Sequence, residues 1–282
     1  MDTRRRRAAL VAPASDERKA RKALASNADE VILDLEDAVV DGSKDSAREA
    51  ALALVAEFGE QRAVSIRING ADTVWHRDDV AACARADHLA SIVLPKAETP
   101  EQIRSIDAAL GNSSARIQAL VETPRGIRDV SAIAESSDRL AALVIGYADL
   151  AAALGRSPGL PHTTWQTVQE AVLLAARVAE IQAIDGPHLT IADDEVFAAA
   201  KTWVRDLGFD GTWVIHPAQI DTALRVFTPT PEAVADAHRV LAALAEAADR
   251  GSGAAELDGR MLDEALAVSA RRVLANAPEA TA

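Results

Sequence analysis

Seven short apolar runs in this chain end in side chains that can bind or transfer a charge. In a parallel sheet covered on both faces, strands are continuous runs of Val, Ile and Leu, and charge is tolerated where a strand emerges. We therefore expect the polar ends of these runs to share one rim. The runs occupy residues 31–37, 65–69, 92–96, 119–123, 143–149, 183–185 and 213–216.

Two carboxylates on consecutive runs indicate metal chemistry. Glu122 and Asp149 each follow an apolar run directly or after a short turn. Because adjacent strands lie about 5 Å apart, both carboxylates could reach one cation. Mg²⁺ is typically held by one or two carboxylates, with waters and substrate oxygens completing its octahedron. The alternative is that each residue only stabilises the N-terminus of the next helix; for the pair, a metal site is favoured.

Two cations follow other runs. Arg67 lies between two isoleucines, so strand alternation turns it toward the inside of the sheet, where a cation needs an anionic partner. Its guanidinium could donate to a carboxylate or to an oxygen that becomes negative during reaction. The alternative is a structural ion pair with Glu36 or Asp37. Lys96 could act in the same way as a point charge, or could neutralise a neighbouring carboxylate.

The spacing of the runs predicts the elements that position these residues. Each gap between runs is long enough for a helix and its loops, and eight such units are what an eight-stranded barrel needs. We predict an α/β fold: a TIM (β/α)8 barrel over residues 1–228, with an additional C-terminal helical segment over residues 229–282. The runs begin near residues 8, 31, 64, 91, 117, 142, 182 and 212.

Helix signals fall in the gaps. Thr99, followed by Pro100 and by Gln102, has the pattern of a capping box with proline at the first helical position. The low-complexity residues 251–255 are typical of a linker, and residues 257–275 predict a terminal helix outside the barrel. Further expected N-terminal caps are Asp16, Ser43 and Asp193.

Composition narrows the functional class. The formal net charge of −13 disfavours nonspecific nucleic-acid binding, which depends on basic patches. No apolar stretch is long enough to span a bilayer, and the basic residues 4–7 precede an apolar stretch too short for a secretory signal. The single cysteine, Cys83, rules out an intramolecular disulfide and a cysteine-rich metal site. We expect a cytoplasmic enzyme without nucleic-acid or membrane partners.

Eight short motifs follow one another along the chain: LDLEDAV (33–39), RIN (67–69), LPKAE (94–98), VETPRG (121–126), GYADL (146–150), AIDGP (183–187), GFDGTWVIHPAQI (208–220) and DGRMLD (258–263). Taken in order, these motifs resemble the CitE-like branch of the HpcH/HpaI aldolase superfamily. Each motif alone is weak, but the ordered set is specific and extends from about residue 7 to residue 219. A further match in residues 258–263 resembles the C-terminal signature of that family.

The resemblance implies a TIM barrel, usually a homotrimer or a hexamer of trimers. It also implies Mg²⁺-dependent cleavage or formation of a carbon–carbon bond in a hydroxyacyl-CoA thioester. Members include malyl-CoA, methylmalyl-CoA and citramalyl-CoA lyases and the citryl-carrier subunit of citrate lyase. The implied partners are therefore an acyl-CoA thioester and a small 2-keto acid such as glyoxylate or pyruvate.

Carried over residue by residue, the resemblance implies roles for the residues at the rim. Glu122 and Asp149 look like the metal ligands, and Arg67 looks like the residue that touches the thioester or keto-acid oxygen. Glu36 and Asp37 look like groups that position metal-bound water.

The resemblance extends beyond the rim. It implies that Asp263, in the C-terminal segment, is an acid/base that reaches the site of a neighbouring subunit. Substrate binding is implied for Arg67, Lys96, Pro124 and Arg7.

Three hypotheses stay open: a stand-alone acyl-CoA lyase, a citrate lyase subunit acting on a citryl-carrier thioester, and a non-catalytic ligand-binding relative. The complete motif over residues 258–263 favours the first over the second. The presence of Glu122, Asp149 and Arg67 together disfavours the third. Residues 186–188 lean toward the malyl-CoA type, whereas Asp185 and His216 have mainly structural interpretations.

Overall fold

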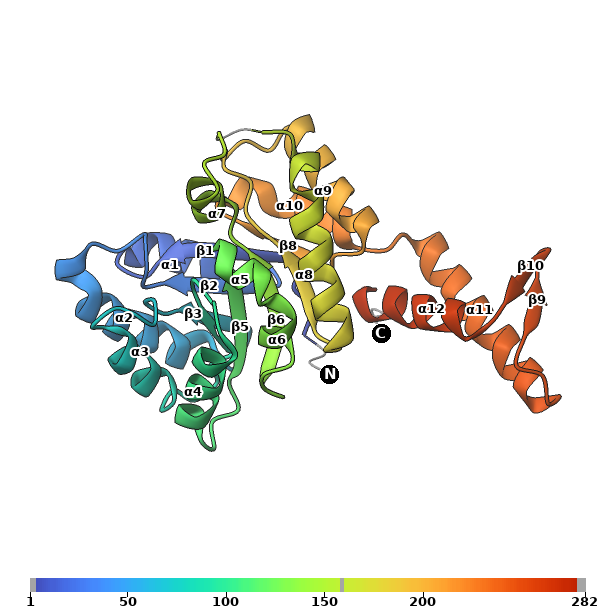
Figure 1. Cartoon of the computed structure of the whole chain (residues 1–282), viewed down its shortest axis with the longest axis horizontal. Helices are drawn as coiled ribbons and strands as arrows, with labels where there is room; N and C mark the ends of the chain where they lie inside the picture. Colours follow the sequence, from blue (N-terminus) through green and yellow to red (C-terminus); the bar gives the residue numbers. More distant parts are fainter. Residues whose placement is uncertain (1–3, 158–159, 278–282) are drawn as a thin grey trace. The chain divides into compact units, whose positions relative to one another are not determined.

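The computed structural model describes residues 4–157 and 160–277. The chain forms two compact units, Met1–Leu224 and Arg225–Ala282, and the boundary lies within helix α10 (Ile220–Phe227) (Figure 1). No helix in the described ranges combines the length and apolarity that a membrane crossing requires.

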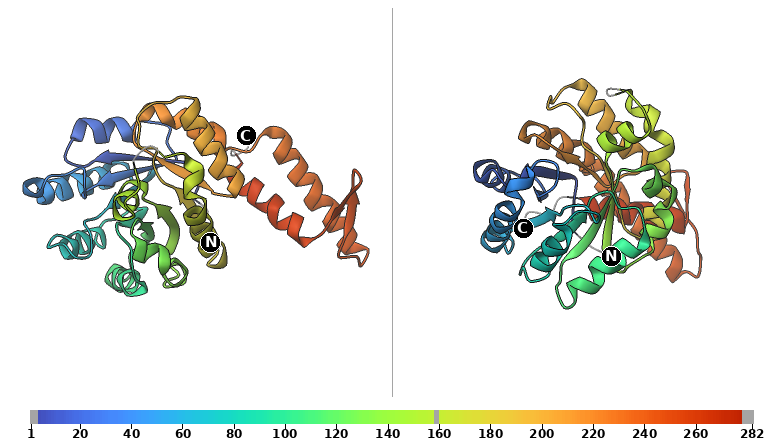
Figure 2. Two further views of the ribbon diagram at one scale, coloured as in Figure 1. Left: turned by 45° about the horizontal axis from the view of Figure 1, so that its top comes forward. Right: turned by 60° about the vertical axis from the view of Figure 1, so that its left-hand side comes forward.

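The first unit is a closed barrel of eight parallel strands, which confirms the predicted TIM barrel. The strands pair in chain order, and β8 closes the barrel against β1. Helices surround the strands, as the right-hand view shows (Figure 2). The strands are β1 Ala8–Pro13, β2 Glu30–Asp34, β3 Ala63–Arg67, β4 Ser91–Leu94, β5 Arg116–Val121, β6 Leu140–Ile145, β7 Gln182–Asp185 and β8 Gly211–Val214.

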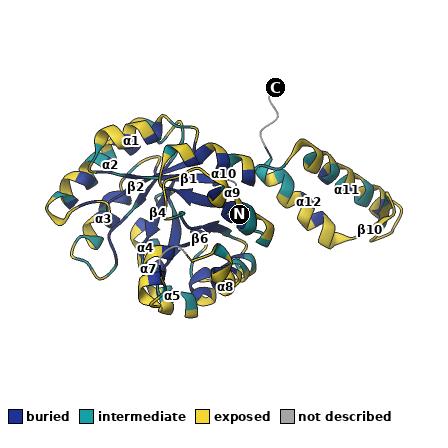
Figure 3. Ribbon diagram, turned by 90° about the horizontal axis from the view of Figure 1, so that it is seen from above, coloured by how far each residue is buried: buried dark blue, intermediate teal, exposed yellow. Residues whose placement is uncertain are grey.

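The segments between the strands are helical, as the gap lengths predict. The α-helices are α1 Glu17–Leu24, α2 Lys44–Phe58, α3 His76–Cys83, α4 Pro100–Leu110, α5 Pro124–Arg128, α6 Val130–Ala134, α7 Tyr147–Ala153, α8 Gln166–Val178 and α9 Glu195–Leu207. Short 3-10 helices are η1 Asp41–Ser43, η2 His162–Trp165 and η3 Pro217–Gln219. The outer faces of the helices are exposed and the strands are buried (Figure 3).

The barrel interior has an apolar middle and polar ends. The middle layer includes Ile32, Leu120 and Trp213, which are almost fully buried, and burial of such a side chain contributes about 1.5–3 kcal/mol. At the N-terminal end of the strands, Arg6 forms a buried ion pair with Glu30, with 2.7 Å between Nε and Oε2. The other end carries the polar residues that follow the apolar runs.

Helix capping follows the sequence with two corrections. Thr99 and Gln102 form the expected capping box, and Asp16 caps α1. The prediction of Asp193 as a cap is wrong, because Asp194 accepts the hydrogen bond from the backbone N–H of Phe197. Ser43 makes no side-chain capping bond, because it already belongs to the 3-10 turn that leads into α2.

The second unit consists of helix α11 (Pro231–Asp249), a two-stranded hairpin (β9 Ala255–Leu257 and β10 Arg260–Leu262) and helix α12 (Glu264–Asn276). The predicted helix over residues 257–275 is therefore wrong at its start. Asp258 and Gly259 have positive φ angles of 52° and 75°, as the two-residue turn of a hairpin requires. That local turn chemistry outweighs the helical periodicity of residues 257–262.

Candidate active site

One lysine lies among three carboxylates where strands β2, β4, β5 and β6 end. The Nζ atom of Lys96 lies 2.5 Å from Oε1 of Glu36, 3.6 Å from Oδ1 of Asp149 and 4.0 Å from Oε1 of Glu122. The structure thus brings both predicted metal ligands within reach of one cationic group. Lys96 is itself only partly buried, so the cluster is open to solvent on one side.

Glu122 is held tightly at the end of β5. The backbone N–H of Lys96, a residue with φ of 49°, donates to its Oε1 at 3.0 Å. Gly146 leaves room on the other side, since a Cβ there would lie only 2.2 Å from Oε2. Burial and the nearby carboxylate of Glu36 raise the pKa of Glu122 to about 8, although Lys96 acts in the opposite direction. The groups around Glu122 therefore supply too little positive charge to keep this carboxylate ionised at neutral pH.

Arg67 faces the barrel interior, as alternation predicts, but its main partner was missed. Its Nε and Nη2 atoms donate to the two carboxylate oxygens of Asp34 at 2.6 and 2.7 Å. Its Nη1 atom lies 3.0 Å from Oε2 of Glu36. Although burial favours its neutral form, Asp34, Glu36 and Glu122 together raise the pKa of Arg67, so it stays charged.

The sequence held one signal for Asp34. It lies two residues before Glu36, so strand alternation puts both carboxylates on one face, and the β2–β3 register places Asp34 beside Arg67. Two of the five N–H groups of the guanidinium donate to Asp34, and Nη1 forms an ion pair with Glu36 outside hydrogen-bond geometry. The N–H groups of Nη1 and Nη2 that do not donate to Asp34 could donate to an oxygen of a bound molecule.

The other predicted site residues are spread over the molecule. Asp37 is exposed beside this cluster, and Pro124 begins α5 just after Glu122. Arg7 is not at the rim, which corrects the prediction that it binds substrate. It directly precedes β1, so it lies at the N-terminal end of the barrel, and its guanidinium pairs with Asp29 at 2.8 Å.

Two residues behave as helix caps. Asp263 is exposed at the start of α12 in the second unit, where it accepts from the backbone N–H of Ala265 at 3.0 Å. His216 accepts from the backbone N–H of Ala218 at 3.2 Å, which fits its structural interpretation.

Asp185 is not a helix cap but is wholly buried at the end of β7.

The cluster fits a hard divalent cation. Among the described residues, no three His, Cys, Asp or Glu side chains are grouped closely enough to hold a metal ion by themselves. Mg²⁺ does not require three, since one or two carboxylates with water and substrate oxygens are usual. Oε2 of Glu36 is buried near Arg67 but outside hydrogen-bond geometry, so this oxygen accepts no hydrogen bond and could face a cation or its water. With Lys96 close to both, Glu122 and Asp149 already share one cation.

The raised pKa of Glu122 predicts how the metal-free protein responds to pH. Because the folded state holds this proton more tightly than the unfolded state, stability falls as pH rises from about 4.5 to about 8. The slope from one such group is at most about 1.4 kcal/mol per pH unit. Melting temperatures in EDTA should show this fall, and Glu122→Gln should reduce it. Equal pH profiles for the two proteins would contradict the prediction.

Comparison with known proteins finds relatives that match over most of the chain. Residues 7–217 match the family model described as HpcH/HpaI aldolase/citrate lyase. A (3S)-malyl-CoA thioesterase of Cereibacter sphaeroides is 36% identical over 273 residues, which cover 96% of this chain and 94% of the relative. An L-malyl-CoA/beta-methylmalyl-CoA lyase of the same species is 35% identical, with 91% and 90% covered.

A solved structure is similar over nearly the whole chain. CitE from Mycobacterium tuberculosis, in complex with magnesium, acetoacetate and coenzyme A, is 32% identical with a TM-score of 0.74. The match covers 95% of this chain and 96% of that protein.

Proposed function

This chain belongs to the HpcH/HpaI aldolase/citrate lyase family, and we propose that it is a Mg²⁺-dependent carbon–carbon lyase acting on a 3-hydroxyacyl-CoA. The proposed substrates are malyl-CoA, methylmalyl-CoA or citramalyl-CoA, with an acyl-CoA and glyoxylate or pyruvate as products. The observation that carries the proposal is the meeting of Glu122 and Asp149 around one cation position. The names of the relatives support the substrate class.

In the proposed reaction, the substrate hydroxyl gives its proton to water, the carbon–carbon bond breaks, the hydroxyl-bearing carbon becomes a carbonyl group, and the bonding electrons leave a thioester enolate. Negative charge therefore moves onto the thioester oxygen, and Arg67 has N–H groups to donate to it. Glu122 and Asp149 would hold Mg²⁺, which as a Lewis acid polarises the oxygens of the keto-acid end. Glu36 and Asp37 would orient water beside this site.

A proton donor for the enolate carbon is needed, and we propose Asp263 of a neighbouring subunit. In condensation the same carboxylate would remove a proton from the acyl-CoA methyl group. Its exposure at the start of α12, outside the barrel, supports a role in trans. A homotrimer or a hexamer of trimers would bring the two subunits together.

A second candidate is hydrolysis of the thioester. The 36% identity to a malyl-CoA thioesterase is as high as the identity to the lyase. The same carboxylates and Arg67 could serve it, since attack of water on a thioester also puts negative charge on the thioester oxygen.

The decisive experiment supplies malyl-CoA, citramalyl-CoA and methylmalyl-CoA in parallel to the purified protein with Mg²⁺. We expect a keto acid to appear with an intact, shorter acyl-CoA. Free thiol without keto acid would indicate hydrolysis, and neither product from any substrate would contradict both candidates. Discrimination between glyoxylate and pyruvate should be about 10- to 200-fold, because one methyl group contributes only about 1–3 kcal/mol.

A further inference from the structure

A buried charged network lies beneath the helix that carries Asp149. Asp185 at the end of β7 and Lys201 on α9 are both wholly buried, with 2.6 Å between Oδ2 and Nζ. The hydroxyl of Tyr147, the first residue of α7, donates to Oδ1 of Asp185 at 2.6 Å. Although burial favours a neutral carboxyl, Lys201 and His162 lower the pKa of Asp185.

The network extends in two directions. Lys201 also donates to the backbone carbonyl of Gly186 at 2.9 Å. Gln169 on α8 donates to the Tyr147 hydroxyl at 2.9 Å, and Trp203 on α9 donates to the side-chain oxygen of Gln169 at 3.1 Å. A buried ion pair is weak evidence for stability, because apolar residues of similar volume often do as well. The Asp185–Lys201 pair therefore matters more for the residues that it holds in place than for its own contribution to stability.

The pair holds the start of α7. The N-cap of this helix is Gly146, which makes no side-chain capping bond, and the first turn carries Asp149. Gly186 packs directly below, since a Cβ there would lie 2.0 Å from the carbonyl oxygen of Ile145 and 2.9 Å from the ring of Tyr147. The segment that contacts Glu122 through Gly146 and carries Asp149 is thus fastened to β7.

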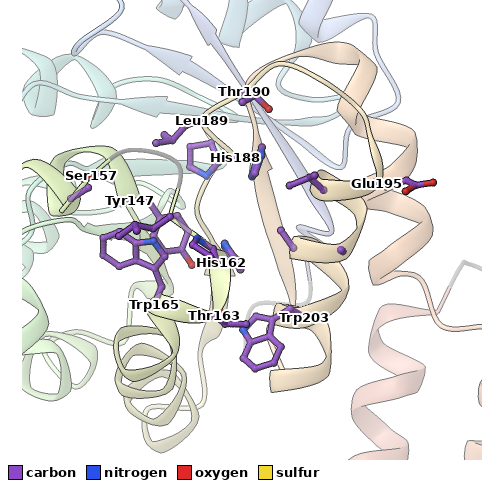
Figure 4. Close-up of a pocket in the computed structure, with 17 residues that line it drawn as sticks. Tyr147, Ser157, His162, Thr163, Trp165, His188, Leu189, Thr190, Glu195 and Trp203 are labelled. Atoms are coloured by element: carbon purple, nitrogen blue, oxygen red, sulfur yellow. The ribbon is translucent and has the colours of Figure 1, made fainter.

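The ring of Tyr147 is almost fully buried, with only 5% of the residue exposed. The ring of Tyr147 packs on those of His162 and Trp165, with centroids 5.2 Å away in each case. It also lines a pocket of about 950 Å³ together with His188 and Trp203 (Figure 4). The hydrogen bond from its hydroxyl to Asp185 ties this ring, and with it the start of α7, to the end of β7.

We propose that Tyr147, anchored by the buried Asp185–Lys201 pair, is a positioning residue that sets Asp149 at the distance from Glu122 that Mg²⁺ requires. The inference rests on the proposed metal site. Loss of the groups that orient metal ligands typically reduces metal affinity 10- to 100-fold. We expect a loss in this range when the Tyr147 hydroxyl is removed.

The test is Mg²⁺ titration by calorimetry of the wild type, Tyr147→Phe and Trp203→Phe. Phenylalanine keeps the ring contacts and removes only the hydroxyl, so Mg²⁺ should bind about 10- to 100-fold more weakly. Trp203→Phe is the matched control, because it removes a donor at the outer end of the network without touching Asp185. It should bind Mg²⁺ like the wild type. Saturating Mg²⁺ should restore turnover in Tyr147→Phe.

The outcomes separate the two proposals. Wild-type affinity in Tyr147→Phe would overturn the positioning role and leave the metal site standing. Equal losses of Mg²⁺ affinity in Tyr147→Phe and Trp203→Phe would also overturn it. So would a fall in the melting temperature of Tyr147→Phe in EDTA large enough to explain its loss of Mg²⁺ affinity, because a general loss of stability would then be the cause. Absence of Mg²⁺ binding by the wild type would overturn the proposed metal site and with it this inference.

Discussion

Glu122→Gln should abolish detectable Mg²⁺ binding and lower turnover by about 10³-fold. A metal acting as a Lewis acid contributes several kcal/mol to transition-state stabilisation, and each 1.36 kcal/mol corresponds to a tenfold change in rate. The amide has the shape of the carboxylate and can still accept from the backbone N–H of Lys96, so the fold should be retained. Calorimetric Mg²⁺ titration and single-substrate kinetics would measure both effects.

Although Glu122→Gln should lose Mg²⁺ binding and turnover, its stability should not decrease. In EDTA near pH 8, the amide avoids the buried charge that gives Glu122 its raised pKa, so the melting temperature should not fall. Glu98→Gln is the matched control, because Glu98 lies near the same rim and is more exposed, with Arg125 at 3.7 Å. Near-normal turnover in Glu122→Gln, or an equal loss in the control, would contradict the role of Glu122.

Arg67→Ala should lower kcat by about 10² to 10³, the usual effect of removing one donor to a developing oxyanion. The substitution also affects stability, because it leaves the buried carboxylate of Asp34 without its paired guanidinium. Breaking a buried ion pair on one side typically costs about 3–5 kcal/mol of stability. Loss of activity in this variant alone would therefore not distinguish chemistry from misfolding.

A second variant makes the distinction. Arg67→Met combined with Asp34→Asn removes both buried charges of the pair and should recover much of the lost melting temperature. Turnover should stay as low as in Arg67→Ala, because the donor is still missing. Mg²⁺ affinity should change little, since neither residue is a proposed ligand. Recovery of near-normal turnover in the double variant would refute the assignment of Arg67.

The barrel could be predicted because its signals are local. Each strand is a short apolar run, and each helix between strands has its own periodicity and caps, as Thr99 and Gln102 show. The order of the runs also places Glu122 and Asp149 after neighbouring strands, at the same end of the sheet. Prediction failed where local chemistry was misjudged, as at Asp258 and Gly259, whose positive φ angles form a hairpin. It also failed for Arg7, which lies before its strand rather than after it.

The strand order and the two carboxylates at one end of the barrel therefore follow from local sequence patterns. The contacts around them depend on the folded chain: Asp34 lies beside Arg67, Lys96 lies among the carboxylates, and Tyr147 binds Asp185. Asp34 and Arg67 are 33 residues apart, and Tyr147 and Asp185 are 38 residues apart. Strand register and side-chain packing set such contacts, and both depend on the closed barrel rather than on any local pattern.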